Sequence, residues 1–538
     1  MGGMTTEYRR MPLPRAVRHG VVLSASALTL LATTVAPAAS FASAAHAAAP
    51  VSAPGSSAPA TDVSGALLPT SAPASEASAS PVAWKPCSDG SAVQCGTIRV
   101  PLDWKKPAGS KIDVKVARVP ARDQAHRVGA LFFNPGGPGG QGATMFEYGA
   151  ADKMFGGPLR ERFDLVSLDP RGTGGSQALD CGPVLDPGQV VFPKSPREYE
   201  EMKRNSRARG ERCLTRHGDL VRNVDTVSVA RDMDVFRAAL GEQRLNYLGV
   251  SYGTFLGATY AQLFPHRIRT MVLDGPVDHA SGSARFLREE AAAMEGEFNG
   301  FVAWCAEDTA CALHGEDVGA VYDRVVARAD RTPIPAPGEK IGAVNGDWIR
   351  MALPEQLLRL RLIEDVTGVN AWVKLSERLA AADRHNDASG LVQGGGYVGN
   401  PDSAYAVVSC LDFPPQFTGY ADAAARLDRA RKVAPRTGAA AEAWVMSASC
   451  ADWPVKATNP WQPTVVRGAP PILIAANTHD PATPLPGARR LAGQIADSRL
   501  LVTDVNGHVS YFNSACARER ETEYLISTKL PAQLTCRG

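Results

Sequence analysis

A serine stands between two glycines in the run Gly249-Val250-Ser251-Tyr252-Gly253. The mostly apolar residues before it, from Leu245, are few enough for a short strand, and apolar residues after it recur at helical spacing. A serine on the tight turn from a strand into a helix is typical of a nucleophile elbow, where its hydroxyl projects above the sheet edge. Flanking glycines are needed because side chains there would clash with neighbouring backbone. The chain has 50 glycines, so a chance glycine-rich turn is the alternative.

A serine hydroxyl is a weak nucleophile at neutral pH and needs an adjacent base. His508 follows a predicted last strand at 499–503, in a Gly-His turn, and is the candidate base. Asp480 follows the preceding strand and is the candidate acid, which would accept the imidazole N–H and stabilise the imidazolium. Asp504 is a rival because it is close to His508 in sequence, but two separate loops normally bring acid and base together. His479 is expected to point away from the site.

A glycine-rich loop, 134–140, directly follows another predicted buried strand, 129–133. Such a loop presents bare backbone N–H groups. Phosphate binding is one use of that geometry, but the sequence lacks the Lys-Ser/Thr pair of a Walker loop. An oxyanion site for acyl transfer fits better, with the N–H groups of Gly137 and Tyr252 as donors. The predicted chemistry is attack by a serine on a carbonyl carbon with a histidine as base, and it requires no metal or cofactor.

Strand and helix patterns alternate from about 130 to 275, which predicts an α/β fold with a largely parallel sheet. Two earlier runs, 97–101 and 112–119, alternate like antiparallel strands. After about 280 helical patterns dominate, and the strand–helix–strand rhythm returns near the end of the chain. We therefore expect a first core part, a mainly helical cap insertion and a second core part at 84–280, 281–460 and 461–538.

Three charged side chains are candidates for contact with a substrate. Glu290 and Glu297 flank an apolar helical stripe in the predicted cap, on one side of it, where they could bind a substrate ammonium group. A solvated helix flank is the more ordinary interpretation of that pattern. Arg171, in the turn after a predicted strand at 163–169, could bind a carboxylate. Hydrogen bonds that hold neighbouring loops are the favoured role for this arginine.

The segment 1–47 has the organisation of an export signal, with a basic start, an apolar run and small-residue cleavage sites. A membrane anchor is the alternative, but the apolar run is short and contains serine and threonine. The segment 48–83 is rich in alanine, serine and proline, and we expect a linker or a removable pro-segment. The net charge of +2 and the lack of a dense Lys/Arg run argue against a nucleic-acid binder.

The chain has ten cysteines and no Cys-x-x-Cys pair, so disulfides are favoured over a zinc site in an exported protein. Connectivity does not follow from sequence alone. The simplest hypothesis pairs neighbours along the chain: Cys87–Cys95, Cys181–Cys213, Cys305–Cys311, Cys410–Cys450 and Cys516–Cys536.

Together these residues resemble the prolyl-aminopeptidase-like α/β-hydrolases. The N-terminal segments and the cysteine positions are most similar to those of secreted bacterial tripeptidyl aminopeptidases. Pro135 stands where many relatives have a histidine. The motifs that carry the resemblance are Gly-Gly-Pro-Gly at 136–139, Asp-x-Arg-Gly-x-Gly at 169–174, Gly-x-Ser-Tyr-Gly at 249–253, Asp-x-x-Thr-Pro at 480–484 and Gly-His at 507–508.

The resemblance implies an α/β-hydrolase core with a helical cap, and a secreted, extracellular serine exopeptidase. Such an enzyme would release short peptides, with tripeptides expected first, from the free N-termini of peptides and proteins. It would have no stable membrane association after signal removal, and we expect a monomer. Carboxylesterase or lipase activity, prolyl aminopeptidase activity and a non-catalytic binding role on the same fold remain open.

Overall fold

The computed structural model describes residues 80–182, 189–339, 341–358, 361, 364, 368–392 and 403–538. The predicted export signal at 1–47 and nearly all of the segment at 48–83 lie outside the described residues. Within the described part of the chain, no helix combines the length and the apolar character that crossing a bilayer requires.

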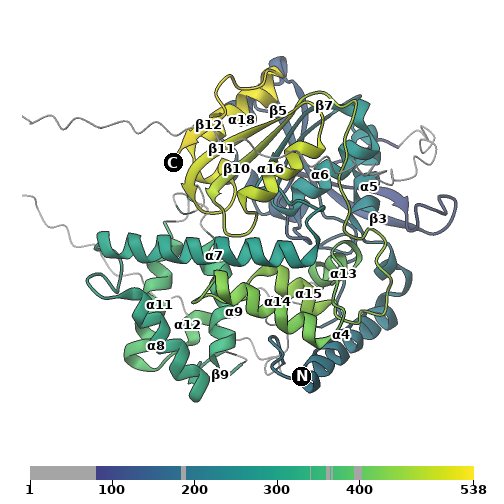
Figure 1. The fold of residues 1–538 in the computed structure, drawn as a ribbon. Helices are drawn as coiled ribbons and strands as arrows, with labels where there is room; N and C mark the ends of the chain where they lie inside the picture. Colours follow the sequence, from purple (N-terminus) through teal and green to yellow (C-terminus); the bar gives the residue numbers. More distant parts are fainter. Residues whose placement is uncertain are drawn as a thin grey trace, which may run out of the picture. The chain divides into compact units, whose positions relative to one another are not determined.

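A ten-stranded sheet organises the described part of the core, in the order β1-β2-β3-β5-β4-β6-β7-β10-β11-β12 (Figure 1). The pairs from β1 to β5 are antiparallel. The pairs from β5 to β12 are parallel, which confirms the predicted fold class. The strands are β1 (Lys85–Pro86), β2 (Gln94–Pro101), β3 (Lys111–Val119), β4 (Gly129–Asn134), β5 (Phe163–Leu168), β6 (Leu245–Val250), β7 (Ile268–Asp274), β10 (Ile472–His479), β11 (Ser498–Asn506) and β12 (Thr535–Arg537).

Both faces of the sheet are buried, because alternate residues of the central strands enter two different apolar layers. In β6, for example, Tyr247 belongs to one layer and Leu248 to the other. The first layer includes α5 (Thr226–Ala239), α6 (Tyr252–Leu263) and α16 (Leu485–Gln494). The second includes α1 (Gly142–Glu147), α2 (Ala150–Met154), α3 (Gly157–Arg162), α17 (Ser510–Asn513) and α18 (Ala515–Ser527).

The stretch between β7 and β10 is mainly helical and has an apolar core of its own. The predicted stripe on its first helix is buried, and Figure 1 shows α7 between the sheet and the other cap helices. Its elements are α7 (Gly282–Glu307), α8 (Val318–Arg331), β8 (Ile334–Pro335), β9 (Ala343–Val344), α9 (Gly346–Leu357), α11 (Ala371–His385), α12 (Ser389–Val392), α13 (Ala404–Asp412), α14 (Tyr420–Val433) and α15 (Glu442–Ser449).

The apolar core of the cap also contains residues that precede the predicted insertion in the sequence. Tyr199 and Met202 of α4 (Pro196–His217) belong to the same apolar cluster as α7 and α15, and so do Val191 and Phe192. The cap is therefore built from two separate stretches of sequence, which the helical pattern after 280 alone does not indicate.

All ten cysteines are paired in the described residues. The pairs are those that neighbour pairing predicts: Cys87–Cys95, Cys181–Cys213, Cys305–Cys311, Cys410–Cys450 and Cys516–Cys536. The bridge from Cys410 to Cys450 ties α13 to the end of α15, and both helices border the site described below.

Candidate active site

Ser251 occupies the sharp turn between β6 and α6. Its backbone has a φ of 57°, a left-handed conformation that is unfavourable for a residue with a side chain. A Cβ on Gly249 would overlap the carbonyl oxygen of Gly253, and a Cβ on Gly253 would lie 2.7 Å from the carbonyl oxygen of Asn134. The two glycines therefore allow strand, helix and neighbouring loop to approach closely enough to present the serine at the sheet edge.

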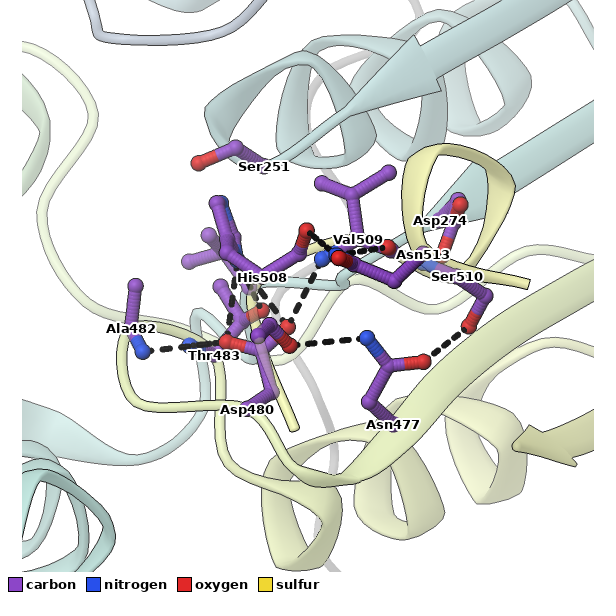
Figure 2. A network of polar contacts seen from close by, with 12 residues as sticks. Ser251, Asp274, Asn477, Asp480, Ala482, Thr483, His508, Val509, Ser510 and Asn513 are labelled. Carbon is purple, nitrogen blue, oxygen red and sulfur yellow. Dashed lines mark hydrogen bonds and ion pairs between the residues drawn. The ribbon is translucent and has the colours of Figure 1, made fainter. Parts of the chain in front are cut away.

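The loops after β11 and β10 bring His508 and Asp480 together. The Nδ1 atom of His508 lies 2.9 Å from each carboxylate oxygen of Asp480. Figure 2 shows the imidazole between the carboxylate of Asp480 and the side chain of Ser251. An N–H at Nδ1 that donates to Asp480 leaves Nε2 as the basic nitrogen of the ring.

Asp480 is buried and accepts backbone N–H groups from Ala482, Thr483 and Val509 at 3.0, 2.8 and 3.2 Å. Burial alone would raise the pKa of this carboxyl, but the charge of His508 and these hydrogen bonds lower the pKa overall. Burial alone would lower the pKa of His508, but the charge of Asp480 and its hydrogen bond to the ring outweigh this effect, so the pKa of the imidazole is raised overall. The carboxylate therefore stabilises the imidazolium that forms when the ring accepts a proton.

Asp504 and His479 lie together on the solvent side of the sheet edge. The carboxylate of Asp504 accepts the hydroxyl of Thr478 at 2.9 Å and lies 3.9 Å from the imidazole of His479. Their side chains are 69% and 53% exposed. Asp504 is thus engaged with residues of β10, while Asp480 occupies the position beside His508.

The glycine-rich loop after β4 packs directly against the elbow. A Cβ on Gly136 would lie 2.8 Å from the Cβ of Ser251 and 3.2 Å from the backbone nitrogen of Tyr252. The N–H of Gly136 is used in a hydrogen bond to Asn134 Oδ1, at 3.0 Å. The next N–H along the loop is that of Gly137, the predicted oxyanion donor. Gly137 has a φ of 110°, and its Cβ would lie 2.9 Å from the nitrogen of Gly139. The loop therefore requires glycine where it approaches the serine.

Tyr252 begins α6, where backbone N–H groups have no partner within the helix. Its hydroxyl is hydrogen-bonded to the hydroxyl of Thr226, which in turn donates to Asp412 Oδ2 at 2.6 Å. Asp412 ends the cap helix α13. This chain of hydrogen bonds fixes the residue after Ser251 against both the core and the cap.

A cleft of about 650 Å³ opens at the glycine loop, on the side of the cap. The loop residues and α1 form one wall, and Glu355 of α9, Tyr405 of α13 and Glu442 of α15 contribute to the other. Burial raises the pKa of Glu442, and a hydrogen bond with Tyr405 and the charge of His508 oppose that rise only in part. Glu442 is therefore electrostatically linked to the imidazole. No sequence pattern marks Glu355 or Glu442, so the sequence alone does not predict either residue.

Glu290 and Glu297 are buried on α7 and do not line that cleft. The carboxylate of Glu290 accepts the backbone N–H groups of Glu442 and Ala443, both at 2.8 Å, and so caps α15. Burial and the charge of Glu442 raise the pKa of Glu290 well above its ordinary value. The carboxylate of Glu297 accepts the side-chain amide of Asn506 at 2.8 Å. Through these contacts Glu290 and Glu297 hold neighbouring elements of the fold together. The carboxylates that line the cleft belong to Glu355 and Glu442.

Arg171 has the role that the sequence favoured. Its guanidinium is fully buried, makes two hydrogen bonds of 2.6 Å to Asp232, and donates to the carbonyl oxygens of Pro101 and Leu102 at 2.9 and 2.8 Å. It therefore holds the loop after β5 against the start of the core.

Comparison with known proteins gives matches along most of the chain. A family model described as alpha/beta hydrolase fold matches residues 129–331, and one described as TAP-like protein matches 436–536. The tripeptidyl aminopeptidase of Streptomyces lividans is 30% identical over 487 residues, which cover 85% of this chain and 86% of that protein. The serine protease Hip1 of Mycobacterium tuberculosis is 30% identical over 491 residues, 84% of this chain and 90% of that protein. Carboxylesterase B of the same species is 31% identical over 487 residues, 84% of this chain and 88% of that protein.

The sheet, the elbow and the family matches define an α/β-hydrolase that acts as a serine hydrolase. Within that class, the chain belongs to the tripeptidyl aminopeptidase family.

Proposed function

We propose that this chain is a secreted serine exopeptidase that releases short peptides, with tripeptides as the expected unit, from the free N-termini of peptides and proteins. The relatives named tripeptidyl aminopeptidase and serine protease Hip1 support peptide substrates. The observation that carries the exopeptidase part is the cleft beside the glycine loop, because its cap wall includes Glu355 and Glu442.

In the proposed mechanism, His508 takes the proton of Ser251 as the serine oxygen attacks the carbonyl carbon of the scissile amide. The N–H groups of Gly137 and Tyr252 stabilise the oxyanion. The imidazolium then donates its proton to the leaving amine, and the acyl group remains on the serine. Water that His508 deprotonates cleaves this acyl-enzyme and restores the serine. Asp480 orients the imidazole and stabilises its charged form throughout.

The proposed role of Glu442 and Glu355 is to bind the α-ammonium group of the substrate. A free N-terminus carries a positive charge through most of the neutral range, and a carboxylate binds it by a charge-assisted hydrogen bond. Burial raises the pKa of Glu442 and the charge of Glu355 adds to that rise, so two negative charges on Glu442 and Glu355 are disfavoured when the cleft is empty. A bound ammonium group would favour full ionisation. The distance from these carboxylates to Ser251 would then determine how many residues are released.

The proposal is tested with chromogenic tripeptide anilides that have free or acetylated N-termini, together with dipeptide anilides, single-residue anilides including proline, and short-chain nitrophenyl esters. We expect the free tripeptide to have the highest kcat/KM and acetylation to lower it by at least tenfold. Equal cleavage of free and acetylated peptides would contradict exopeptidase action. Preference for a single N-terminal proline would instead identify a prolyl aminopeptidase.

Carboxylesterase activity is the second candidate, because the relative named carboxylesterase B is as similar as the peptidases. Hydrolysis of the esters without hydrolysis of any anilide would favour it. A fluorophosphonate probe separates both enzymes from a non-catalytic binder: the wild type should be labelled and Ser251→Ala should not, whereas an unlabelled wild type would favour the binder.

Secretion is part of the proposal, and the disulfides and the predicted export signal support it. Expression of the full chain in a bacterial host with its own leader, followed by N-terminal sequencing of the protein in the medium, tests it. We expect a new N-terminus near residue 47, or near 83 if the second segment is also removed. Retention of the intact chain in cells would contradict secretion.

A further inference from the structure

Asp274, the last residue of β7, is fully buried and contacts two parts of the site at once. Its backbone carbonyl accepts the N–H of Ser251 at 3.0 Å. Its carboxylate accepts the N–H groups of Ser510 and Tyr511 at 2.8 and 2.7 Å. One residue is therefore bonded both to the backbone of the elbow serine and to the turn that follows His508. Figure 2 shows Asp274 beside Ser510 of that turn.

The turn that Asp274 holds is strained. Val509, directly after His508, has a φ of 70°, a region that β-branched residues avoid. The N–H of Val509 donates to Asp480, and the next two N–H groups donate to Asp274. Three consecutive backbone N–H groups thus donate hydrogen bonds to two buried carboxylates. These hydrogen bonds offset the unfavourable conformation, which would otherwise relax and turn the imidazole.

Gly275, the residue after Asp274, lies close to the same imidazole. Gly275 has a φ of 66°, and a Cβ there would lie 3.2 Å from Cε1 of His508 and 3.1 Å from the hydroxyl of Thr483. The end of β7 therefore provides both a surface against which the ring lies and the carboxylate that holds its loop.

We propose that Asp274 is a positioning residue for the site: its carboxylate fixes the His508 turn to the strand end that also holds Ser251. The inference depends on the roles proposed above for Ser251 and His508. Asp274 contacts no reacting atom and acts through the orientation of the imidazole. Its loss should lower kcat and leave KM nearly unchanged.

The first test replaces Asp274 by asparagine in the full chain. The amide has one acceptor oxygen, and its NH₂ group would face a backbone N–H that the second carboxylate oxygen now accepts. We expect kcat for the free tripeptide anilide to fall about 10- to 100-fold, with KM within about twofold of wild type. An unchanged kcat, or a loss that appears only in KM, would overturn the proposal. If this variant does not fold, Asp274→Ser takes its place in the same comparison.

The matched control is Glu295→Gln on α7. Glu295 is also buried and also accepts two backbone N–H groups, those of Arg436 and Thr437, at 3.2 and 2.9 Å. This variant makes the same chemical change in the cap, and its kcat should stay at the wild-type value. A fall in kcat equal to that of Asp274→Asn would assign the effect to general destabilisation and overturn the proposal.

The second test repeats Asp274→Asn in a His508→Ala background, with residual hydrolysis of an activated ester as the readout. Without the imidazole there is nothing for Asp274 to orient, so we expect no further loss. A further 10- to 100-fold loss would overturn the proposal. Wild-type activity of His508→Ala alone would instead refute the proposed function, and that outcome is distinct from either result for Asp274.

Discussion

The proposed ammonium site leads to a quantitative prediction for Glu442→Gln. At 4 Å and an effective dielectric of about 20, an ion pair contributes about 4 kcal/mol, whereas hydrogen bonds to charged groups contribute about 1.5–3 kcal/mol net. Glu442 is partly buried with a raised pKa, so part of the gain is needed to ionise it. We therefore take about 2 kcal/mol, which predicts a fall of about 30-fold in kcat/KM.

The assay compares kcat/KM for free and acetylated tripeptide anilides in the same preparation. The acetylated substrate has no ammonium group, so Glu442→Gln should leave its kcat/KM within about twofold of wild type. Glu355 is exposed, and Glu355→Gln should cost about 1 kcal/mol, or about fivefold, on the free substrate only. Glu377→Gln on α11, with a side chain 49% exposed, is the matched control and should change neither value. An equal loss on both substrates, or no loss on the free one, would refute the reasoning.

Three further predictions follow from the site. Asp480→Asn should lower kcat by about 10⁴-fold, because the amide no longer fixes the tautomer of His508, and a loss below tenfold in steady-state assays would contradict the assigned acid. Gly137→Ala should lower kcat by about 10²- to 10³-fold, since its Cβ would lie 2.9 Å from the nitrogen of Gly139 at a φ of 110°. Gly149→Ala, at a φ of 80° with nothing within 4 Å, is its control and should keep wild-type kcat. Finally, the carboxyl of Glu442 becomes neutral as the pH falls, and its raised pKa means that this happens at a higher pH than for an ordinary glutamate. KM for free peptides should therefore rise on acidification, while KM for acetylated peptides stays flat. Parallel pH profiles for the two substrates would contradict this.

The elements around the elbow could be predicted because their signals are local. Two glycines, an apolar run of strand length and a helical repeat specify the turn at Ser251, since each depends only on near neighbours. Asp480 and His508 could be selected because loops after adjacent parallel strands meet at one sheet edge. The pairing of neighbouring cysteines likewise reflects short connections along the chain.

The cap side of the site could not be predicted in this way. The stripe on α7 identified a packed helix, but its pattern could not reveal that α15 would cover its flank and bury Glu290. Nor does any local pattern direct Glu355 or Glu442 toward the cleft, because that depends on how several cap helices pack against each other. The contribution of α4 to the cap core is of the same kind.

The sequence by itself determined the fold class, the elbow and the two loops that carry Asp480 and His508, because strand order and turn chemistry are encoded in short segments. Only the tertiary structure decided which carboxylates line the cleft and that Asp274 links Ser251 to the turn after His508. The physical reason is distance along the chain: contacts between residues of separate elements depend on the packing of whole elements, and no periodicity within one element records them.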